Sequence, residues 1–321
     1  MEVADKAEVH PKSARSIANL AEAFLVSKVV GGCSERTVGV YRSWLDKFRA
    51  HVGEDPAALD SVAVVQFFID LREHGLSAST VHQAYRTLKT FTRWLLATGV
   101  LRGNPLAGLS IKMPSILPEV PTEDELRAVL ACCPPTLVGA RNRAMILTMA
   151  DAGLRAGEVL RLLVEHWNPA ERSLFVRAGK GQKDRVSFVG ATTTRAIRDY
   201  LAMKTLVSRE DCLFVDVEGR PLKIRHLVQI LHRLSARAGL SPNRRLHPHA
   251  LRHLAATSWL RHGVGLDQVR RLLGHASLHT TLRYSSLVAA DLQRAHKDAG
   301  AIERAALDIA WRSTPRGPRA R

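Results

Sequence analysis

The stretch LLGHASLHTTLRY, residues 272–284, decides how the rest of the chain is interpreted. Gly274 follows a helical pattern over residues 266–273, and glycine in this place commonly ends a helix. The turn would project His275 from a helix terminus, and Tyr284 lies nine residues later on the next predicted helix. Taken alone, such a tyrosine would be a half-buried helix residue, so its function depends on its partners.

Three other short stretches carry residues suited to phosphate chemistry. GLRAGEVLRL holds Arg155 and Glu158, and HPHALRH holds His249 and Arg252. Each pair is three residues apart, a spacing that places two side chains on one face of a helix. Lys180 lies in the glycine-flanked turn GKGQKDR, where a lysine can move to close on a ligand.

Cleavage of a phosphodiester without a metal ion needs three kinds of side chain. Cationic donors stabilise the charge that develops on the phosphate oxygens, and the arginine fork pairs with two oxygens at once. A nucleophile must attack, and a proton donor must protect the departing sugar oxygen. A tyrosine with a pKa near 10 is ionised in about one molecule per thousand at pH 7, so it needs a histidine and arginines nearby. The stretches contain these residue types, but spacing alone does not prove that they meet.

In their order, these stretches resemble the motifs of the tyrosine recombinase, or phage integrase, family, above all its simple two-domain Xer-like members. LLGHASLHTTLRY is similar to the family's LGH-x-x-x-x-TT-x-x-Y motif, and GLRAGEVLRL is similar to its GLR-x-x-E motif. The family order is Arg, Lys, His-x-x-Arg, His or Trp, then Tyr. The matching residues here are Arg155, Lys180, His249, Arg252, His275 and Tyr284.

The resemblance implies that Tyr284 attacks the scissile phosphate, forms a 3′-phosphotyrosine and frees a 5′-hydroxyl. It implies that Arg155 and Arg252 clamp the phosphate. Lys180 is implied as the general acid for the leaving 5′ oxygen, with Lys183 as its rival in the same loop.

Two histidines and one acid complete the implied set. His249 is a candidate acceptor of the tyrosine proton, His275 hydrogen-bonds the phosphate, and Glu158 braces the site. Because a phosphotyrosine conserves the bond energy, the resemblance implies no metal, no ATP and no other cofactor.

The resemblance also implies the partners. They are double-stranded DNA with a specific site and further copies of the chain, in a homotetramer that exchanges strands through a Holliday junction. The free protein would be a monomer or a dimer, and a directing protein is a further candidate partner that the sequence does not identify. The apolar pattern of residues 302–311 fits a C-terminal segment that packs on a neighbouring protomer.

Bulk composition agrees with a DNA partner. The 321 residues carry a net charge of +17, which favours association with a polyanion. Residues 223–271 contain a single acid, Asp267, so we expect this segment to face phosphates. Its ten cations are Lys223, Arg225, Arg233, Arg237, Arg244, Arg245, Arg252, Arg261, Arg270 and Arg271.

Membrane and secreted classes are disfavoured by the sequence. No apolar run reaches the roughly 18 residues that span a bilayer, and residues 1–15 lack the apolar core of a secretory signal. We therefore expect a cytoplasmic protein. Its four cysteines, without CxxC spacing, are expected to be free thiols: Cys33, Cys132, Cys133 and Cys212.

The predicted fold class is mostly α-helical with a small β-hairpin: an N-terminal helical core-binding bundle and a C-terminal α+β catalytic domain. The bundle helices begin near Ser16, Ser34, Asp60 and Ser77, the last one ending near Gly99. The predicted division is a disordered tail (1–12), a core-binding domain (13–101), a proline-rich linker (102–121), a catalytic domain (122–300) and a C-terminal segment with a basic tail (301–321).

The catalytic domain is predicted to hold helices and one hairpin. The hairpin arms are Leu174–Arg177 and Arg185–Val189, on either side of the turn with Lys180. Thr122 and Glu125 have the spacing of a capping box. The predicted helices are 122–132, 141–152, 156–162, 191–203, 223–238, 248–262, 266–273 and 278–296.

Further basic residues are expected to contact DNA rather than to act in the chemistry. The fourth helix carries a polar face that includes Arg86 and Lys89 and could lie in a groove, although an ordinary solvent face fits nearly as well. The other expected DNA contacts are Lys183, Arg185, Arg244 and Arg245.

Three alternative interpretations stay open at this stage. A relaxing topoisomerase of the IB type shares similar chemistry, but the helical first domain and the TT-x-x-Y motif argue against it. A decayed integrase that only binds DNA is disfavoured because all the expected catalytic residues are present. A zinc site made of His247, His249 and His253 is weak, since no cysteine or carboxylate partner has suitable spacing.

Overall fold

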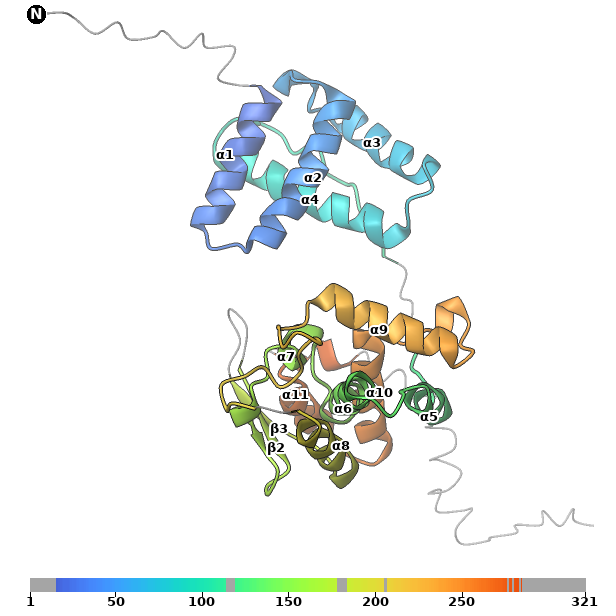
Figure 1. Ribbon diagram of the computed structural model, residues 1–321. Coiled ribbons are helices and arrows are strands. Elements are labelled where there is room, and N and C mark those ends of the chain that lie inside the picture. Colours follow the sequence, from blue (N-terminus) through green and yellow to red (C-terminus); the bar gives the residue numbers. More distant parts are fainter. Residues whose placement is uncertain are drawn as a thin grey trace, which may run out of the picture. The chain divides into compact units, whose positions relative to one another are not determined.

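The chain divides into two compact units, Met1–Ile116 and Leu117–Arg321 (Figure 1). Among the residues that the structure describes, no helix is long and apolar enough to cross a membrane. The computed structural model describes residues 16–113, 119–177, 184–204, 207–275, 277–278, 280–282 and 284.

The first unit is a bundle of helices whose starts are fixed by side-chain caps. Ser16, Ser34, Asp60 and Ser77 each accept a hydrogen bond from the backbone N–H three residues later, the arrangement preferred at a helix N-terminus. These caps confirm the predicted starts. The helices are α1 (Ile17–Val30), α2 (Glu35–Val52), α3 (Ser61–Glu73) and α4 (Ala78–Ala97), with a short 3₁₀ turn at Pro56–Ala58.

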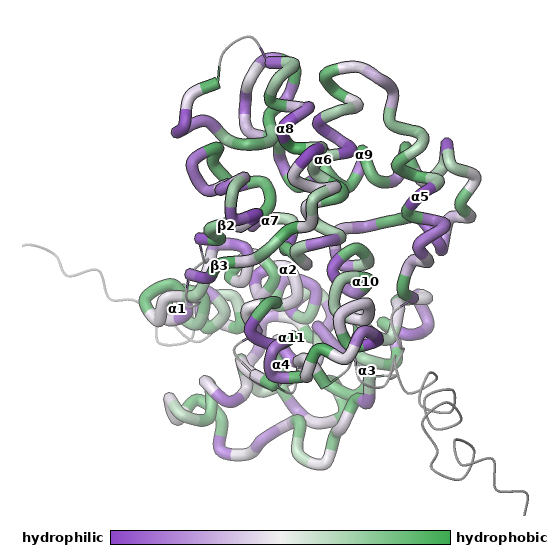
Figure 2. The backbone as a smooth tube through the Cα atoms, turned by 90° about the horizontal axis from the view of Figure 1, so that it is seen from below, coloured by the Kyte–Doolittle hydropathy of each residue, from purple (hydrophilic) through white to green (hydrophobic). Residues whose placement is uncertain are grey.

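The core of this unit is aromatic. Phe24 of α1 lies edge-on to Phe91 of α4, with ring centroids 5.3 Å apart, and Phe48 of α2 meets Phe67 of α3 at 5.1 Å. Edge-to-face pairs of this kind add to the stabilisation that burial provides. Figure 2 shows hydrophobic and hydrophilic residues alternating along the helices, as expected when each helix buries one face.

The segment predicted as a linker is partly packed instead. Leu106 is 5% exposed and Ile111 is 8% exposed, and both belong to the core of the first unit. The hydroxyl of Tyr85 donates to the carbonyl of Leu109 (2.9 Å), and Nδ1 of His82 donates to that of Ile111 (3.0 Å). The prolines correctly predicted a break between helices, but the apolar residues between these prolines pack against α4 and the core of the first unit.

In the second unit, helices surround the buried α6. Met145, Ile146 and Met149 of this helix are fully buried, and α6 packs mainly against α8 and α10 (Figure 1). The helices are α5 (Glu123–Ala131), α6 (Leu137–Ala152), α7 (Ala156–Val159), α8 (Ala191–Ala202), α9 (Ile224–Arg237), α10 (Pro248–Arg261) and α11 (Leu266–Leu273), with 3₁₀ turns at Val164–His166 and Pro242–Arg244.

Two helices differ from their predicted lengths. α6 begins at Leu137 instead of 141, because the Thr136 side chain caps it by accepting from the N–H of Gly139 (3.2 Å). α7 ends at Val159 instead of 162, because the carbonyl of Leu162 accepts from the N–H of Leu213 (2.7 Å) in a distant segment and so does not continue the helix. Of the predicted helix 278–296, the described residues between 278 and 284 are helical, and the remainder lies outside the described residues.

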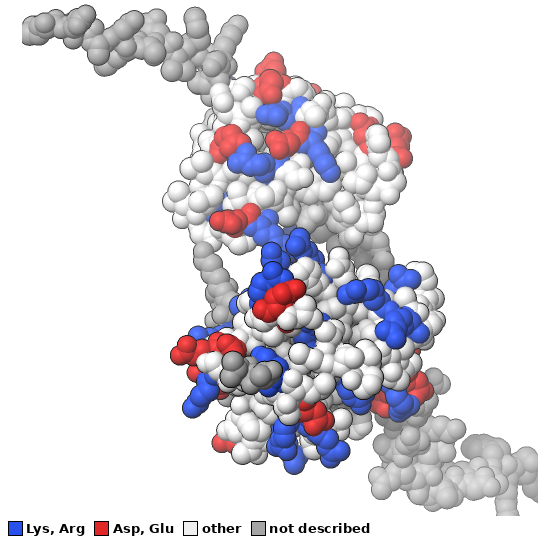
Figure 3. Space-filling model, viewed as in Figure 1, with Lys and Arg blue, Asp and Glu red and all other residues white. Residues whose placement is uncertain are grey.

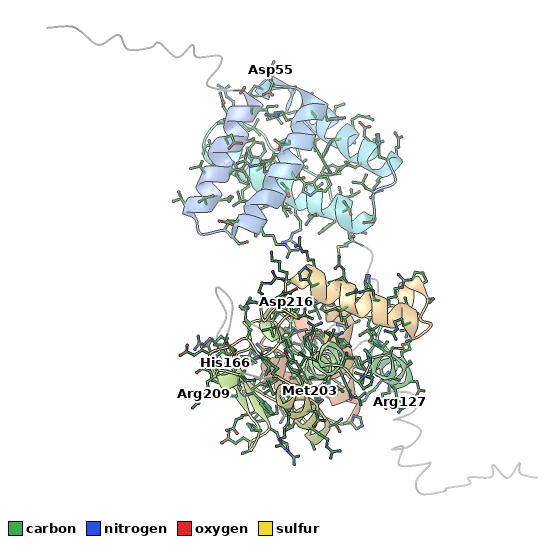
Figure 4. All side chains as sticks on the ribbon, in the orientation of Figure 1. Asp55, Arg127, His166, Met203, Arg209 and Asp216 are labelled. Carbon is green, nitrogen blue, oxygen red and sulfur yellow. The ribbon has the colours of Figure 1, made fainter. Side chains whose placement is uncertain are left out.

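A three-stranded antiparallel sheet, in the order β1-β2-β3, contains the predicted hairpin. β2 (Ser173–Val176) pairs with β3 (Arg185–Phe188), and Val176 faces Arg185. β1 (Trp167–Asn168), only two residues long, was not predicted. The 3₁₀ turn before β1 lies beside a later loop, because the N–H of Glu165 donates to the carbonyl of Arg209 (2.9 Å). His166 and Arg209 therefore lie near each other (Figure 4).

The packing of the proline-rich segment predicts that Leu106→Ala weakens the first unit. Truncating a buried leucine costs about 2–5 kcal/mol, so amide hydrogens of α4 should exchange faster in the full-length variant. Met113→Ala, at a position 56% exposed on the same segment, is the matched control. Equal exchange in the two variants would show that the segment does not support α4.

Candidate active site

Side chains from three separate elements meet at the carboxylate of Glu158. Nη1 of Arg155 lies 2.8 Å from Oε1, Arg185 donates from Nη1 (3.0 Å to Oε1) and Nη2 (2.8 Å to Oε2), and Nη1 of Arg252 lies 3.9 Å from Oε2. These arginines come from the start of α7, from β3 and from α10. The structure therefore brings together Arg155, Glu158 and Arg252, which the sequence predicted as parts of one site.

Arg155 is held at the N-terminus of α7. Its backbone N–H donates to Oε2 of Glu158 (2.8 Å), so the carboxylate caps the helix and binds the side chain of the same residue. The Arg155 side chain is 29% exposed and that of Glu158 is 3% exposed. The guanidinium of Arg155 thus reaches the surface while its anchor stays buried.

Arg252 is more deeply buried, at 3% exposure. Its Nη1 donates to the carbonyl of Gly153 and its Nη2 to that of Leu273, both at 2.6 Å. Burial, followed by the charge of Arg155, lowers the pKa of Arg252 to about 10. The guanidinium therefore remains charged at neutral pH, and its orientation is fixed by backbone acceptors.

Two glycines with left-handed backbone make this anchoring possible. Gly153 (φ 62°) ends α6 and Gly274 (φ 65°) ends α11, a conformation that disfavours any residue with a side chain. A Cβ on Gly153 would lie 2.9 Å from the Leu273 side chain, and one on Gly274 would lie 3.0–3.2 Å from atoms of Arg185. Both positions therefore need glycine for conformation and for space.

Electrostatics keeps Glu158 ionised. Burial by itself would raise its pKa, but the hydrogen bonds and charge of Arg185, with the bonds from Arg155, lower the pKa from 4.5 to about 2. An ionised carboxylate in this place offsets the repulsion between guanidinium groups that lie close together.

Tyr284 lies beside two histidines in a small core. The side chain is 3% exposed and packs in a cluster with Ala256, Val269 and Leu273. Its ring stacks nearly parallel to His275 (7° between planes, centroids 6.2 Å apart) and is tilted against His253 (57°, 5.3 Å). The charge of an ionised Tyr284 favours the charged form of Arg252, so the phenol lies within electrostatic range of that guanidinium.

The predicted histidines take different positions. His275, 7% exposed, is hydrogen-bonded through Nδ1 to Oγ1 of the buried Thr281 (2.9 Å). His249 is in the first turn of α10, one turn before Arg252, and burial together with the charges of Arg252 and Arg155 lowers its pKa. Nδ1 of His247 caps α10 by accepting from the N–H of Ala250 (3.2 Å).

Two of the residues expected to contact DNA are engaged within the protein. The Arg185 side chain is 10% exposed, and all three of its nitrogens donate to Glu158 or to the carbonyl of Leu272. Arg244 binds Glu125 (2.5 and 2.8 Å) and Glu119 (3.1 Å). The sequence did not reveal these partners because they lie far away along the chain.

The remaining expected DNA contacts stay predictions. Arg86 and Lys89 are exposed on α4, Arg245 is half-buried, and Lys180 and Lys183 lie outside the described residues. Figure 3 shows Lys and Arg side chains spread over the visible face of the second unit, with fewer acids among them. Within the part of the chain that the structure describes, no three His, Cys, Asp or Glu side chains gather as a metal site.

Comparison with protein families gives matches in both units. Residues 119–290 match the phage integrase family, and residues 20–100 match the phage integrase N-terminal SAM-like domain. Tyrosine recombinase XerC of Lacticaseibacillus casei is 30% identical over 276 residues, which are 81% of this chain and 91% of the relative. Tyrosine recombinase XerA of Pyrococcus furiosus is 30% identical over 289 residues, 88% of this chain and 94% of the relative.

Solved structures share the fold. The Tn1549 transposon integrase in complex with transposon right end DNA has a TM-score of 0.72 at 17% identity, covering 89% of this chain and 99% of that one. The XerH site-specific recombinase bound to palindromic difH substrate has a TM-score of 0.68 at 23% identity, with coverages of 90% and 85%. A lambda integrase dimer bound to a COC′ core site has a TM-score of 0.71 at 16% identity, with coverages of 84% and 95%.

The ion pairs of Glu158 predict a pH-dependent contribution to stability. Because the folded-state pKa lies below the ordinary value, the carboxylate contributes about 3 kcal/mol above pH 5. This contribution is lost as the pH falls from 4.5 toward 2. In urea titrations, the unfolding free-energy difference between wild type and Glu158→Gln should shrink between pH 7 and pH 3. Glu123→Gln, at an exposed position of α5, is the matched control that removes a surface carboxylate, and a difference for Glu158→Gln that stays constant between pH 7 and pH 3 would refute this account.

The packing of Gly274 predicts a specific coupling to Arg185. Gly263→Ala, at a residue with φ 81° and open space around it, should cost only the backbone strain of about 1–2 kcal/mol. Gly274→Ala should cost about 3 kcal/mol or more, because it also displaces a buried charge partner. In an Arg185→Ala background that extra cost should disappear in urea unfolding, whereas additive costs would disprove the coupling.

Proposed function

The chain belongs to the phage integrase family and is a tyrosine site-specific recombinase that acts on DNA, and from this premise we propose that Tyr284 is its nucleophile. The observation that carries the proposal is the position of Tyr284. Its ring stacks on His275 and lies within electrostatic range of Arg252, whose guanidinium shares Glu158 with Arg155.

In the proposed reaction, Arg155 and Arg252 bind the non-bridging oxygens of the scissile phosphate. Arg252 is suited to this task because two backbone carbonyls fix its plane before DNA arrives, and pre-set donors lower a barrier without reorganising. Arg155 reaches the surface from its capped position. His275 adds a hydrogen bond to the phosphate, with its ring held by Thr281.

The proposed reaction forms and breaks one phosphodiester bond in each step and needs no separate source of energy. The phenolic oxygen of Tyr284 attacks phosphorus and loses its proton to His249, whose lowered pKa keeps the imidazole neutral and able to accept it. The bond to the 5′ oxygen breaks, and Lys180 protonates that oxygen. A 5′-hydroxyl of the partner strand later attacks the phosphotyrosine, Lys180 takes up the proton of that hydroxyl, and His249 returns a proton to the released Tyr284. Each step exchanges one phosphodiester for another, so neither ATP nor a metal ion is required.

We extend the proposal to assembly and DNA binding. Four copies would exchange strands through a Holliday junction, with residues 302–311 packing on a neighbouring protomer and a directing protein choosing the outcome. The first domain, residues 13–101, would grip the core site, and residues 122–300 would catalyse. Arg86, Lys89, Lys183 and Arg245 would add phosphate contacts. The activity would take place in the cytoplasm. A lambda integrase dimer bound to a core site and a XerH complex with its substrate support the DNA-binding part of this proposal by analogy.

The nucleophile can be tested without knowing the recognition sequence. A pool of nicked duplexes with randomised sequence around the nick would be incubated with wild-type protein, and covalently trapped DNA would be amplified and sequenced. With the selected duplex, wild type should form an SDS-resistant adduct. Tyr284→Phe should form at least about 10³-fold less, because it lacks the attacking oxygen.

Mass spectrometry supplies the second readout. Trypsin should release a nucleotide-modified peptide that covers residues 284–294, between Arg283 and Arg294. A modification elsewhere, or an adduct with Tyr284→Phe, would refute the assignment. Relaxation of supercoiled plasmids that lack the selected site would instead indicate a topoisomerase.

A further inference from the structure

Arg185 lies where the hairpin joins the arginine cluster. It is the first residue of β3 and faces Val176, and this pair is the last described rung of the hairpin, since residues 178–183 lie outside the described residues. Its side chain points inward, at 10% exposure, although the sequence placed it among the expected DNA contacts. A charged side chain in such a position needs partners, and Arg185 has one for every nitrogen.

These partners belong to two different parts of the site. Nη1 and Nη2 bind both oxygens of Glu158 (3.0 and 2.8 Å), and Nε donates to the carbonyl of Leu272 (3.1 Å). The next carbonyl, that of Leu273, accepts from Arg252. Arg185 therefore ties the hairpin strand to the acid that holds Arg155 and to the end of α11, two residues before Gly274.

The chain at the end of α11 is shaped to admit this side chain. Atoms of Arg185 lie within 3.0–3.2 Å of the point where a Cβ of residue 274 would be. His275 follows immediately, with its ring bonded to Thr281 and stacked on Tyr284. A shift of Arg185 would thus reach both the phosphate-binding arginines and the segment that carries the nucleophile.

Arg185 also neutralises the charge of Glu158, which affects how strongly Glu158 attracts Arg252. A carboxylate accepts about four hydrogen bonds, and Arg185 supplies two of those that Glu158 receives. Without Arg185, the buried carboxylate would attract Arg252, whose Nη1 is already 3.9 Å away. Arg252 would then bind an internal acid more tightly and the phosphate less tightly.

We propose that Arg185 is a positioning residue for DNA cleavage, which locks Glu158 and the end of α11 in place so that Arg155 and Arg252 converge on one phosphate. This inference rests on the proposed function. It assigns no phosphate contact to Arg185 itself, because the bidentate pair with Glu158 already neutralises the charge of Arg185, whereas the short bonds of Arg252 go to neutral carbonyls.

The test compares Arg185→Met and Arg185→Lys with wild type on the selected nicked duplex. Single-turnover adduct formation with saturating protein should slow roughly 10- to 100-fold in both variants, as is usual when a supporting residue is lost. Lysine should not rescue the rate, since one ammonium group cannot bridge Glu158 and Leu272 as the guanidinium fork does. Arg198→Met, at an exposed position of α8, removes the same charge and should keep the wild-type rate.

DNA affinity separates positioning from phosphate contact. The slope of log K against log salt should stay at the wild-type value in the Arg185 variants. A lost phosphate contact would reduce that slope by about 0.9 and would overturn the proposal. The pH profile provides a third readout. Glu158 should take up a proton at higher pH without its two bonds from Arg185, so cleavage by Arg185→Met should begin to fall at a higher pH than cleavage by wild type.

The outcomes are distinguishable from failure of the proposed function. If wild type forms no adduct through Tyr284, the proposed nucleophile is wrong whatever Arg185 does. If wild type forms the adduct and a folded Arg185→Lys matches its rate, the positioning proposal is wrong. Thermal unfolding of each variant identifies any that does not fold. Arg185→Lys keeps a charge beside Glu158, so its cleavage rate tests the proposal even if Arg185→Met does not fold.

Discussion

One buried carboxylate makes the arrangement of this site possible. A phosphate-cleaving centre needs several cations around one point, but guanidinium groups placed together in a protein interior repel one another and lose hydration. Glu158 resolves this conflict by holding Arg155 and Arg185 directly and by lying 3.9 Å from Arg252. Because the same carboxylate caps α7 through the backbone of Arg155, local helix geometry and long-range charge pairing depend on a single side chain.

Backbone geometry contributes the second constraint. The two helices that end at Gly153 and Gly274 direct the nearby carbonyls of Gly153 and Leu273 toward Arg252. Left-handed glycines allow the chain to turn at these points without a side chain that would fill the space. The buried guanidinium is thereby satisfied before substrate binds, and its charge persists at a pKa of about 10.

Much of this organisation could be predicted from the sequence, for reasons that are local. The caps at Ser16, Ser34 and Ser77 and the hairpin around Lys180 follow from residue types at short spacing. The motifs of the chain also identified Arg155, Glu158 and Arg252 as parts of one site. The sequence could not show the partners of Arg185 and Arg244, because those ion pairs join residues 27 and 119 positions apart. Basic residues near the catalytic motifs therefore suggested DNA contacts where the fold uses two of them internally.

The distribution of charge explains why the site still favours DNA binding although Arg185 is paired inside the protein. Three guanidinium groups around one carboxylate leave two positive charges uncompensated within the cluster. Arg185 and Glu158 neutralise each other in a bidentate pair, so the excess resides on Arg155, which reaches the surface, and on Arg252, which bonds only to neutral carbonyls at short distance. A phosphodiester brings one negative charge, and its transition state develops a second on the same oxygens. In the proposed reaction the cluster is thus better matched in charge to the transition state than to the bound substrate, which is the condition under which binding energy accelerates a reaction.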